Sequence, residues 1–433
     1  MTLFKNFRLG LIHMAVAVSL VPITSVLNRV MIHELGILAT IVAGLIILPH
    51  LLSPMQMVIG QFSDTHPLWG YRRTPYIAAG LLLCVGGSVL TPIAALAMDA
   101  SFWPGLAFAF FAFLIWGVGY NLAVVSYLSL ASDMSNEGQR SRTIAVMWFM
   151  MITAVIATAI IAGRAMEHYD PALLVRVFFT AGGIALTLGF LGLIGLEPRG
   201  QVTRVSERHS AREAIGAVVS NPQARAFFVY LTLLLAAILG QDVLLEPFGA
   251  RAFGMSVRQT TQLTAVWGGA TLLALLLYGF VLSRFLSKKA GASLGATLAA
   301  LGFFTITLSG MLHVEALFVP GIAILGFGTG IATTTNLALM LDMTTPANAG
   351  LFIGAWGMAD AAARGMGNFL ASVVRDIATS ILANPVAGYG VVFMLEGLIL
   401  CVTLVLLRQI DPATFRGEQD VSLSELIAVA GDA

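Results

Sequence analysis

Two carboxylates four residues apart are the first candidates for chemistry in this sequence. Asp242 and Glu246 stand at the end of a long apolar run. On a helix they share one face, and because neighbouring carboxylates repel each other, one of them could hold a proton. The pair could carry protons, ligate a hard cation, or form ion pairs with Arg29 and Arg251. Since Asn28 and Arg29 occupy the matching end of the first apolar run, a salt bridge between these helix ends is the simplest interpretation.

A second charged pair lies inside a later apolar run that begins near Trp356. Asp360 precedes Arg364 by one helical turn, which is the spacing of a stabilising ion pair on a helix. The two charges could simply neutralise each other. The alanines and glycines around them, including Gly365 and Gly367, leave space beside the helix for another helix or for a flat ring system.

His50 is the histidine most able to act as a ligand. It lies in an apolar Leu-Pro-His-Leu string, and a neutral imidazole can ligate a metal, including the magnesium of a chlorophyll. A lone histidine in such a helix is more often only hydrogen-bonded. The sequence has no HxxxH motif, no Walker-type loop and no arrangement typical of a nucleophile triad. We therefore predict no catalytic residue, no metal site and no enzyme activity.

The composition places these residues in a membrane protein. Of the 433 residues, 58% are hydrophobic and only 10% are charged, and the mean hydropathy is +0.90. Soluble domains contain about 25% charged residues, so lipid must cover most of this surface. The net charge of +1 gives no reason to expect binding to nucleic acid. Cys84 and Cys401 do not have the spacing of a disulfide or zinc motif.

The apolar windows predict an all-α protein with twelve transmembrane helices, each near the length of about 20 residues that spans a bilayer. The predicted spans are 9–28, 37–62, 74–97, 103–131, 143–163, 172–195, 225–244, 259–285, 290–312, 315–341, 349–375 and 387–408.

These spans divide into two halves. We predict a six-helix half at 1–196, a cytoplasmic linker at 197–224, a second six-helix half at 225–408 and a cytoplasmic tail at 409–433. Lysine and arginine concentrate in the segments that lie inside when both termini are cytoplasmic. The dipeptide Asp133-Met134 recurs in the second half as Asp342-Met343, and the glycines that precede it recur at the same distance before the dipeptide. Two pseudo-symmetric parallel repeats of six helices are typical of the major facilitator fold.

The loop between the second and third spans resembles the facilitator signature, which acts as a latch between conformations. It is longer than the usual form, and in the second half Ser283 stands where an aspartate is expected. The alternative is an ordinary interfacial anchor, with Trp69 and Tyr71 at the level of the lipid headgroups. The predicted latch consists of residues at this loop and of two residues in the loop between the fourth and fifth spans. The first group is Gly60, Asp64, Gly70, Arg72 and Arg73, and the second is Glu137 and Arg140.

Four strings together resemble the PucC/LhaA branch of the major facilitator superfamily, also called the bacteriochlorophyll delivery family. They are the Asn28-Arg29 string, the long loop that ends in Arg72-Arg73, the Asp242 to Glu246 string, and the segment from Trp356 to Arg364. The resemblance covers about 5–408. The long loop and the Asp-x-x-x-Glu-Pro string are its specific parts.

The resemblance implies a non-enzymatic factor for assembly of light-harvesting antenna complexes in the inner or intracytoplasmic photosynthetic membrane of a bacterium. Such a factor hands (bacterio)chlorophyll to antenna polypeptides, close to chlorophyll synthase and the membrane-insertion machinery. No tightly bound cofactor is implied, and (bacterio)chlorophyll is the candidate cargo. The candidate pigment contacts are Asn28, Arg29, His50, Asp242, Glu246, Trp356, Asp360 and Arg364. An ion-coupled transporter of a small solute is the alternative, and a scaffold for antenna helices and the synthase is a third.

Overall fold

The computed structural model is helical, as expected for a chain whose backbone must satisfy its own hydrogen bonds inside lipid. It describes residues 3–53, 55–134, 137–167, 169–199, 216, 219, 221–342 and 349–410. Within these ranges the only extended pairing is an isolated bridge between Leu68 and Tyr71. The all-α class predicted from the sequence is confirmed.

The helices before the predicted linker begin with one long helix that continues into two π-helical segments. Their bounds are α1 (Leu3–Val21), η1 (Pro22–Leu27), η2 (Val30–Glu34), α2 (Ala39–Ile46), α3 (Leu48–Leu51), α4 (Met55–Thr65), α5 (Thr74–Ala100), α6 (Phe102–Met134), α7 (Glu137–Ala165) and α8 (Pro171–Leu193).

The helices after the predicted linker include a second interrupted helix near their start. Their bounds are α10 (Pro222–Leu239), η3 (Gly240–Val243), α11 (Leu245–Phe253), α12 (Val257–Phe280), η4 (Leu282–Arg284), α13 (Lys288–Leu312), α14 (Glu315–Asp342), α15 (Ala349–Leu382) and α16 (Pro385–Arg408).

Among the described residues, ten helices are long and apolar enough to cross a membrane, and they match ten of the predicted spans. The other two predicted spans, 37–62 and 349–375, are not among these ten helices, each for its own reason. The first is divided among the short helices α2, α3 and α4. The second lies in α15, which is 34 residues long but carries four charged side chains: Asp360, Arg364, Arg375 and Asp376.

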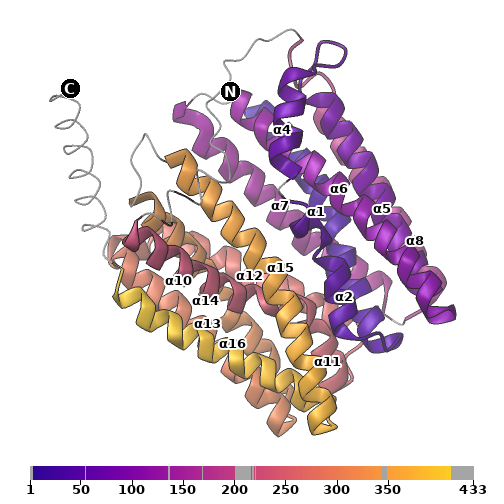
Figure 1. The fold of residues 1–433 in the computed structure, drawn as a ribbon, viewed down its shortest axis with the longest axis vertical. Coiled ribbons are helices and arrows are strands. Elements are labelled where there is room, and N and C mark those ends of the chain that lie inside the picture. The colour runs from indigo at the N-terminus through magenta and orange to yellow at the C-terminus, as the bar shows by residue number, and fades with distance from the viewer. Residues whose placement is uncertain are drawn as a thin grey trace. The chain divides into compact units, whose positions relative to one another are not determined.

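The chain divides into two compact units by its internal contacts. Unit 1 contains 1–205 together with 242–268 and 368–389, and unit 2 contains 206–241, 269–367 and 390–433. In unit 1, α5 packs against α6 and α8 (Figure 1). The core of this unit lies between α1 and these helices, around Leu9, Ile77, Leu81 and Tyr127. The boundaries that we predicted for the two halves remain a prediction.

The internal sequence repeat corresponds to a repeated helix contact. In unit 1, Gly119 of α6 lies against the backbone of α5 at Cys84. In unit 2 the matching residue, Gly328 of α14, lies against the backbone of α13 at Ala299. In both places a Cβ atom would collide with a backbone nitrogen, so glycine is what allows the two helices to approach this closely.

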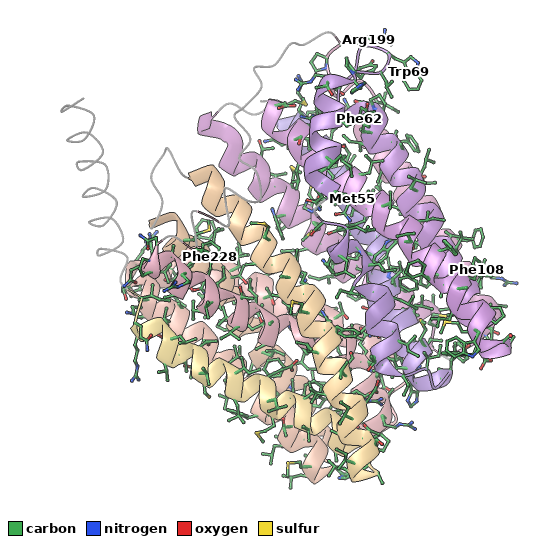
Figure 2. All side chains as sticks on the ribbon, viewed as in Figure 1. Met55, Phe62, Trp69, Phe108, Arg199 and Phe228 are labelled. Atoms are coloured by element: carbon green, nitrogen blue, oxygen red, sulfur yellow. The ribbon has the colours of Figure 1, made fainter. Side chains whose placement is uncertain are left out.

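The predicted latch loop forms a tight hairpin. Leu68 and Tyr71 exchange two backbone hydrogen bonds of 2.9 Å across Trp69 and Gly70. Both central residues have positive φ, 53° and 79°, as in a type I′ turn, which glycine adopts easily and tryptophan only at a cost. The Trp69 side chain is 82% exposed and points away from the helices (Figure 2).

Candidate functional site at a broken helix

The main polar site surrounds Val243, where one helix ends and another begins. The turn η3 ends at Val243 and α11 starts at Leu245, so the break frees backbone groups from helical pairing. Asn28 Nδ2 donates to the carbonyl oxygen of Val243 at 2.8 Å, and the N–H of Val243 donates to Asn368 Oδ1 at 3.1 Å. Both asparagines are buried. Side chains thus satisfy both peptide groups of Val243, as a break inside a membrane protein requires.

Arg29 follows Asn28 and is buried with only 3% of its surface exposed. Its Nη1 forms an ion pair of 2.5 Å with Glu34 Oε1, and its Nη2 donates to the carbonyl oxygen of Met255 at 3.2 Å. The salt bridge expected between these helix ends therefore does not form at Arg29, whose ion-pair partner is Glu34. An α-helix pairs residues three or four apart, whereas the wider π-helical turn brings Glu34, five residues on, to the same side.

Glu246 lies in α11, between the candidate spans Pro222–Val243 and Val257–Arg284, and is 3% exposed. Its Oε1 accepts a hydrogen bond of 2.6 Å from Thr264 Oγ1, which is itself 3.0 Å from Ser25 Oγ. Its Oε2 is buried without a hydrogen-bond partner. Asp242 is half-buried in η3, so the break separates it from the helix that carries Glu246. The shared helical face expected for the two carboxylates is interrupted.

A neighbouring polar cluster in unit 1 was not anticipated from the sequence. Asp376 of α15 accepts from both Thr40 N and Thr40 Oγ1, at 2.8 and 2.7 Å, and so caps the start of α2. Arg375 forms a 2.7 Å ion pair with Asp376 and donates to Tyr389 Oη at 3.0 Å, with its guanidinium 4.4 Å from the centre of the tyrosine ring. The available signal was a charged dipeptide inside a helix whose other residues are mostly apolar.

The predicted pair of Asp360 and Arg364 is confirmed within unit 2. Arg364 Nε lies 3.1 Å from Asp360 Oδ2, and about a third of each side chain is exposed (38% for Arg364 and 34% for Asp360). The space expected beside Gly367 is taken by α10, because a Cβ atom there would lie 2.7 Å from the carbonyl oxygen of Ala236. At this position the small residue accommodates a helix rather than a ring.

Some predicted residues lie apart from the helix break or outside what the structure describes. His50 is half-buried in the four-residue helix α3. The side chains of Asp64, Glu137, Arg140 and Trp356, and the surroundings of Gly60, lie outside the described residues. The structure thus brings Asn28, Arg29 and Glu246 to one buried site, places Asp242 next to it in the chain, and sets Asp360 with Arg364 as a separate pair.

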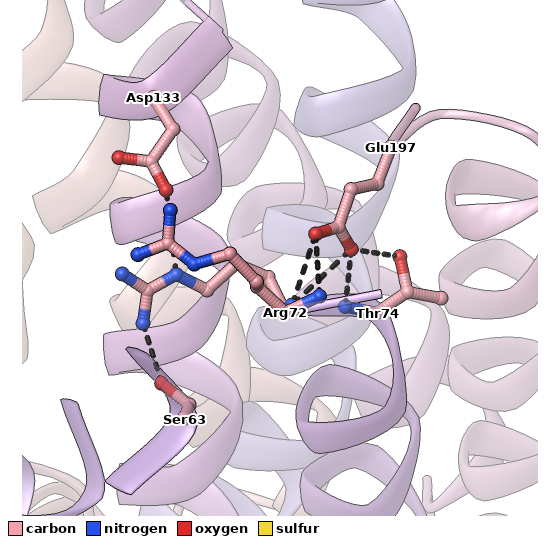
Figure 3. Close-up of polar contacts among 6 residues, drawn as sticks. Ser63, Arg72, Thr74, Asp133 and Glu197 are labelled. Atoms are coloured by element: carbon pink, nitrogen blue, oxygen red, sulfur yellow. Dashed lines mark hydrogen bonds and ion pairs between the residues drawn. The ribbon is translucent and has the colours of Figure 1, made fainter. Parts of the chain in front are cut away.

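The predicted latch arginines meet a carboxylate that the sequence analysis did not name. Glu197 accepts hydrogen bonds from the backbone N–H groups of Arg72, Arg73 and Thr74, at 2.8, 3.1 and 2.7 Å, and from Thr74 Oγ1 at 2.7 Å (Figure 3). A carboxylate at this position caps the N-terminus of α5 and interacts favourably with its dipole.

Arg73 itself points into the protein. Its Nε lies 3.4 Å from Asp133 Oδ2 on α6, and its Nη1 donates to Ser63 Oγ on α4 (Figure 3). Gly70 provides one of the two positive φ angles of the hairpin before it. The arrangement ties α4, α5 and α6 together. Two sequence signals could have identified the acids, because Asp133 stands in the internal repeat and Glu197 directly follows the sixth span.

Comparisons with known proteins give a family match over most of the chain. The family model described as PUCC protein matches residues 26–415. Protein PucC of Rhodovulum sulfidophilum is 34% identical over 388 residues, which cover 86% of this chain and 85% of that protein. A protein of Rhodobacter capsulatus named bacteriochlorophyll synthase 44.5 kDa chain is 28% identical over 409 residues, which cover 92% of this chain and 94% of that protein.

Solved structures of transporters share the architecture at low identity. The nucleoside transporter NupG aligns with a TM-score of 0.69 at 13% identity, over 94% of this chain and 98% of the transporter. A D-xylose–proton symporter aligns with a TM-score of 0.66 at 14% identity, over 92% and 97% of the two chains. These likenesses confirm the predicted major facilitator fold and, at such identities, support nothing beyond the fold.

Proposed function

This chain belongs to the PUCC protein family, and we propose on that premise that it is a non-enzymatic membrane factor for assembly of light-harvesting antennas. In this proposal it delivers (bacterio)chlorophyll to antenna polypeptides in a bacterial photosynthetic membrane. The observation that carries the proposal is the family match over residues 26–415, which include the helix break and the Glu197 cluster. One relative is named as a chain of a bacteriochlorophyll synthase, and this name supports a place for the present chain beside pigment synthesis.

The contacts of the polar side chains at these sites favour a structural role over a role in catalysis. Asn28, Asn368 and Glu197 bind backbone groups at a helix break or a helix start, and Arg29 pairs with Glu34. Such contacts fix helix geometry and leave these groups engaged with the protein itself. The pigment contacts proposed from the sequence are Asn28, Arg29, His50, Asp242, Glu246, Trp356, Asp360 and Arg364.

The proposal is tested by the absorption spectrum of the protein purified from a host that makes bacteriochlorophyll. We expect the spectrum of a bound bacteriochlorophyll, and we expect chlorophyll synthase and antenna polypeptides to co-purify. An unrelated transporter of the same fold, purified in parallel, measures pigment that is carried over with lipid. If the protein co-purifies with its partners but holds no more pigment than this control, the proposed role changes from pigment delivery to that of a scaffold.

The alternative is an ion-coupled transporter of a small solute, which the likeness to NupG and to the D-xylose–proton symporter supports. If the carboxylate of Asp242 carries the coupling ion, Asp242→Asn abolishes uptake of the solute while the protein remains folded. Uptake into vesicles by the variant at the wild-type rate would remove Asp242 from this role.

The predicted orientation is a further part of the proposal. With both termini in the cytoplasm, a reporter that is active only in the cytoplasm should be active when fused after Arg408 and inactive when fused after Arg251. The reverse pattern would invert the topology, and it would place the Glu197 cluster on the outer face.

A further inference from the structure

Glu246 combines deep burial with an incomplete set of hydrogen bonds. The side chain is 3% exposed, Oε1 is bonded to Thr264, and Oε2 is buried with no hydrogen-bond partner in the described part of the chain. A buried carboxylate that has no ion-pair partner and leaves one oxygen unsatisfied costs several kcal/mol as an anion. The same group costs much less as a neutral carboxylic acid.

The charged groups around Glu246 do not offer it an ion pair. Arg29 is the cation whose charge acts on Glu246, but its guanidinium already binds Glu34 and the carbonyl oxygen of Met255. The titratable and charged residues on the elements next to Glu246 are Asp242 on η3, Arg251 on α11, Arg29, His33 and Glu34 on the segment that continues α1, Arg258 on α12, and Tyr389 on α16, which Arg375 of the Arg375–Asp376 ion pair contacts.

We propose that Glu246 is a proton-binding site whose proton is shared with the hydroxyl groups of Thr264 and Ser25. When neutral, Glu246 can donate through Oε1 to Thr264 Oγ1 at 2.6 Å, and Thr264 can then donate to Ser25 Oγ at 3.0 Å. In the pair of hydroxyls either oxygen can be the donor. The three groups form a short chain that accepts a proton when the hydroxyl hydrogens of Thr264 and Ser25 rotate, with no movement of heavy atoms.

A metal cation fits this site less well than a proton does. Calcium and magnesium bind six or more oxygen ligands, whereas the few oxygens at this site, those of Glu246, Thr264 and Ser25, are already hydrogen-bonded to one another. The positive charge of Arg29 opposes a metal cation. Burial, the larger effect, raises the pKa of Glu246, whereas the charge of Arg29 lowers that pKa.

The proton has a structural consequence, because α11 packs against η2. Asn28 holds Val243 just before α11, and Arg29 holds Met255 just after it. An anion at Glu246 would have to recruit water into this contact. Protonation therefore stabilises the packing of α11 on the segment that continues α1, and deprotonation loosens it. This inference goes beyond the proposed function and does not depend on the cargo.

Infrared spectroscopy of the purified full chain in lipid tests the site directly. At neutral pH we expect a carbonyl band from a protonated carboxylic acid that is lost in Glu246→Gln. The same substitution at an exposed carboxylate, Glu315→Gln, is the matched control and should leave the band intact. A band of undiminished intensity in Glu246→Gln, or a wild-type spectrum without one, would overturn the proposal; a weaker residual band is expected if Glu396, which is also buried, is protonated.

A second measurement covers the case in which Glu246→Gln alters the fold. Because the folded protein holds the proton more tightly than the unfolded chain, its stability should fall as the pH rises from mildly acidic to alkaline. We expect this fall in melting temperature for the wild type and for Glu315→Gln, and a flatter profile for Glu246→Gln. In Thr264→Val the carbonyl band should remain but shift, since its hydrogen bond is gone. Parallel pH profiles for wild type and Glu246→Gln, or an unshifted band in Thr264→Val, would contradict a shared proton.

Discussion

Arg73 is the residue on which several helices of unit 1 converge. Its side chain is buried between Asp133 of α6 and Ser63 of α4, while its backbone N–H is bound by Glu197 (Figure 3). The guanidinium group can serve two oxygens at once because its donors point in fixed directions. A residue that sequence analysis assigned to a latch therefore also determines how α4, α5 and α6 meet.

We expect Arg73→Met to lower the free energy of unfolding by about 1–3 kcal/mol, because it removes the cation from a partly buried ion pair and leaves the buried Ser63 hydroxyl without this donor. Arg199→Met is the matched control, since Arg199 is exposed and contacts the Tyr71 ring and hydroxyl. Its effect should stay near 0.5 kcal/mol, about the size of a surface substitution. Denaturant unfolding in detergent measures both, and equal losses would refute the role given to Arg73.

At the scale of elements, the helix break depends on two amides with opposite hydrogen-bonding roles. Asn28 donates to Val243 through Nδ2, whereas Asn368 accepts from Val243 through Oδ1. The two residues thus respond differently to the same change of side chain. Aspartate retains an acceptor oxygen but has no amide donor.

This difference gives a paired prediction for Asn28→Asp and Asn368→Asp. Both variants bury a new carboxyl group, but only Asn28→Asp faces the carbonyl oxygen of Val243 with another acceptor. We expect Asn28→Asp to be less stable than Asn368→Asp by about 1–3 kcal/mol, the cost of a buried unsatisfied group. Melting temperatures at neutral pH decide the order. A larger loss in Asn368→Asp would show that the hydrogen bonds to Val243 do not control the break.

At the scale of the molecule, the sequence predicted what depends on composition and local spacing. The spans follow from hydropathy because lipid demands long apolar helices, and the pair of Asp360 with Arg364 follows from a regular helical turn. The repeat around Asp133 and Asp342 indicated two related halves, because the same residue types recur at a constant spacing.

The contacts that sequence analysis missed depend on irregular or distant geometry. The pair of Arg29 with Glu34 needs a π-helical turn, which no hydropathy pattern reveals. Glu197 on Arg73, and Asp376 on Thr40, join positions more than a hundred residues apart. The sequence signals that mark Glu197 and Asp376 as unusual carboxylates do not say which distant backbone group or side chain each one binds.

The repeated close contact allows a prediction for the whole architecture. Gly119→Val and Gly328→Val should each destabilise the chain by about 1–3 kcal/mol or more, since the added carbons enter occupied space between two helices. Gly183 and Gly279 meet nothing within 4 Å of a built Cβ atom, so valine there should leave the melting temperature nearly unchanged. Similar losses at all four glycines would point to helix propensity rather than to packing between helices.

The two amides at Val243 also bear on how the chain is made. A ribosome synthesises the protein from its N-terminus, so Asn28 enters the membrane long before its partner at Val243 exists, and Asn368 follows later still. The peptide groups at the break can therefore be completed only after α15 has been translated. In a nascent chain that ends before Asn368, the N–H of Val243 would lack its hydrogen-bond acceptor. Water or a chaperone would have to bind this group until synthesis ends.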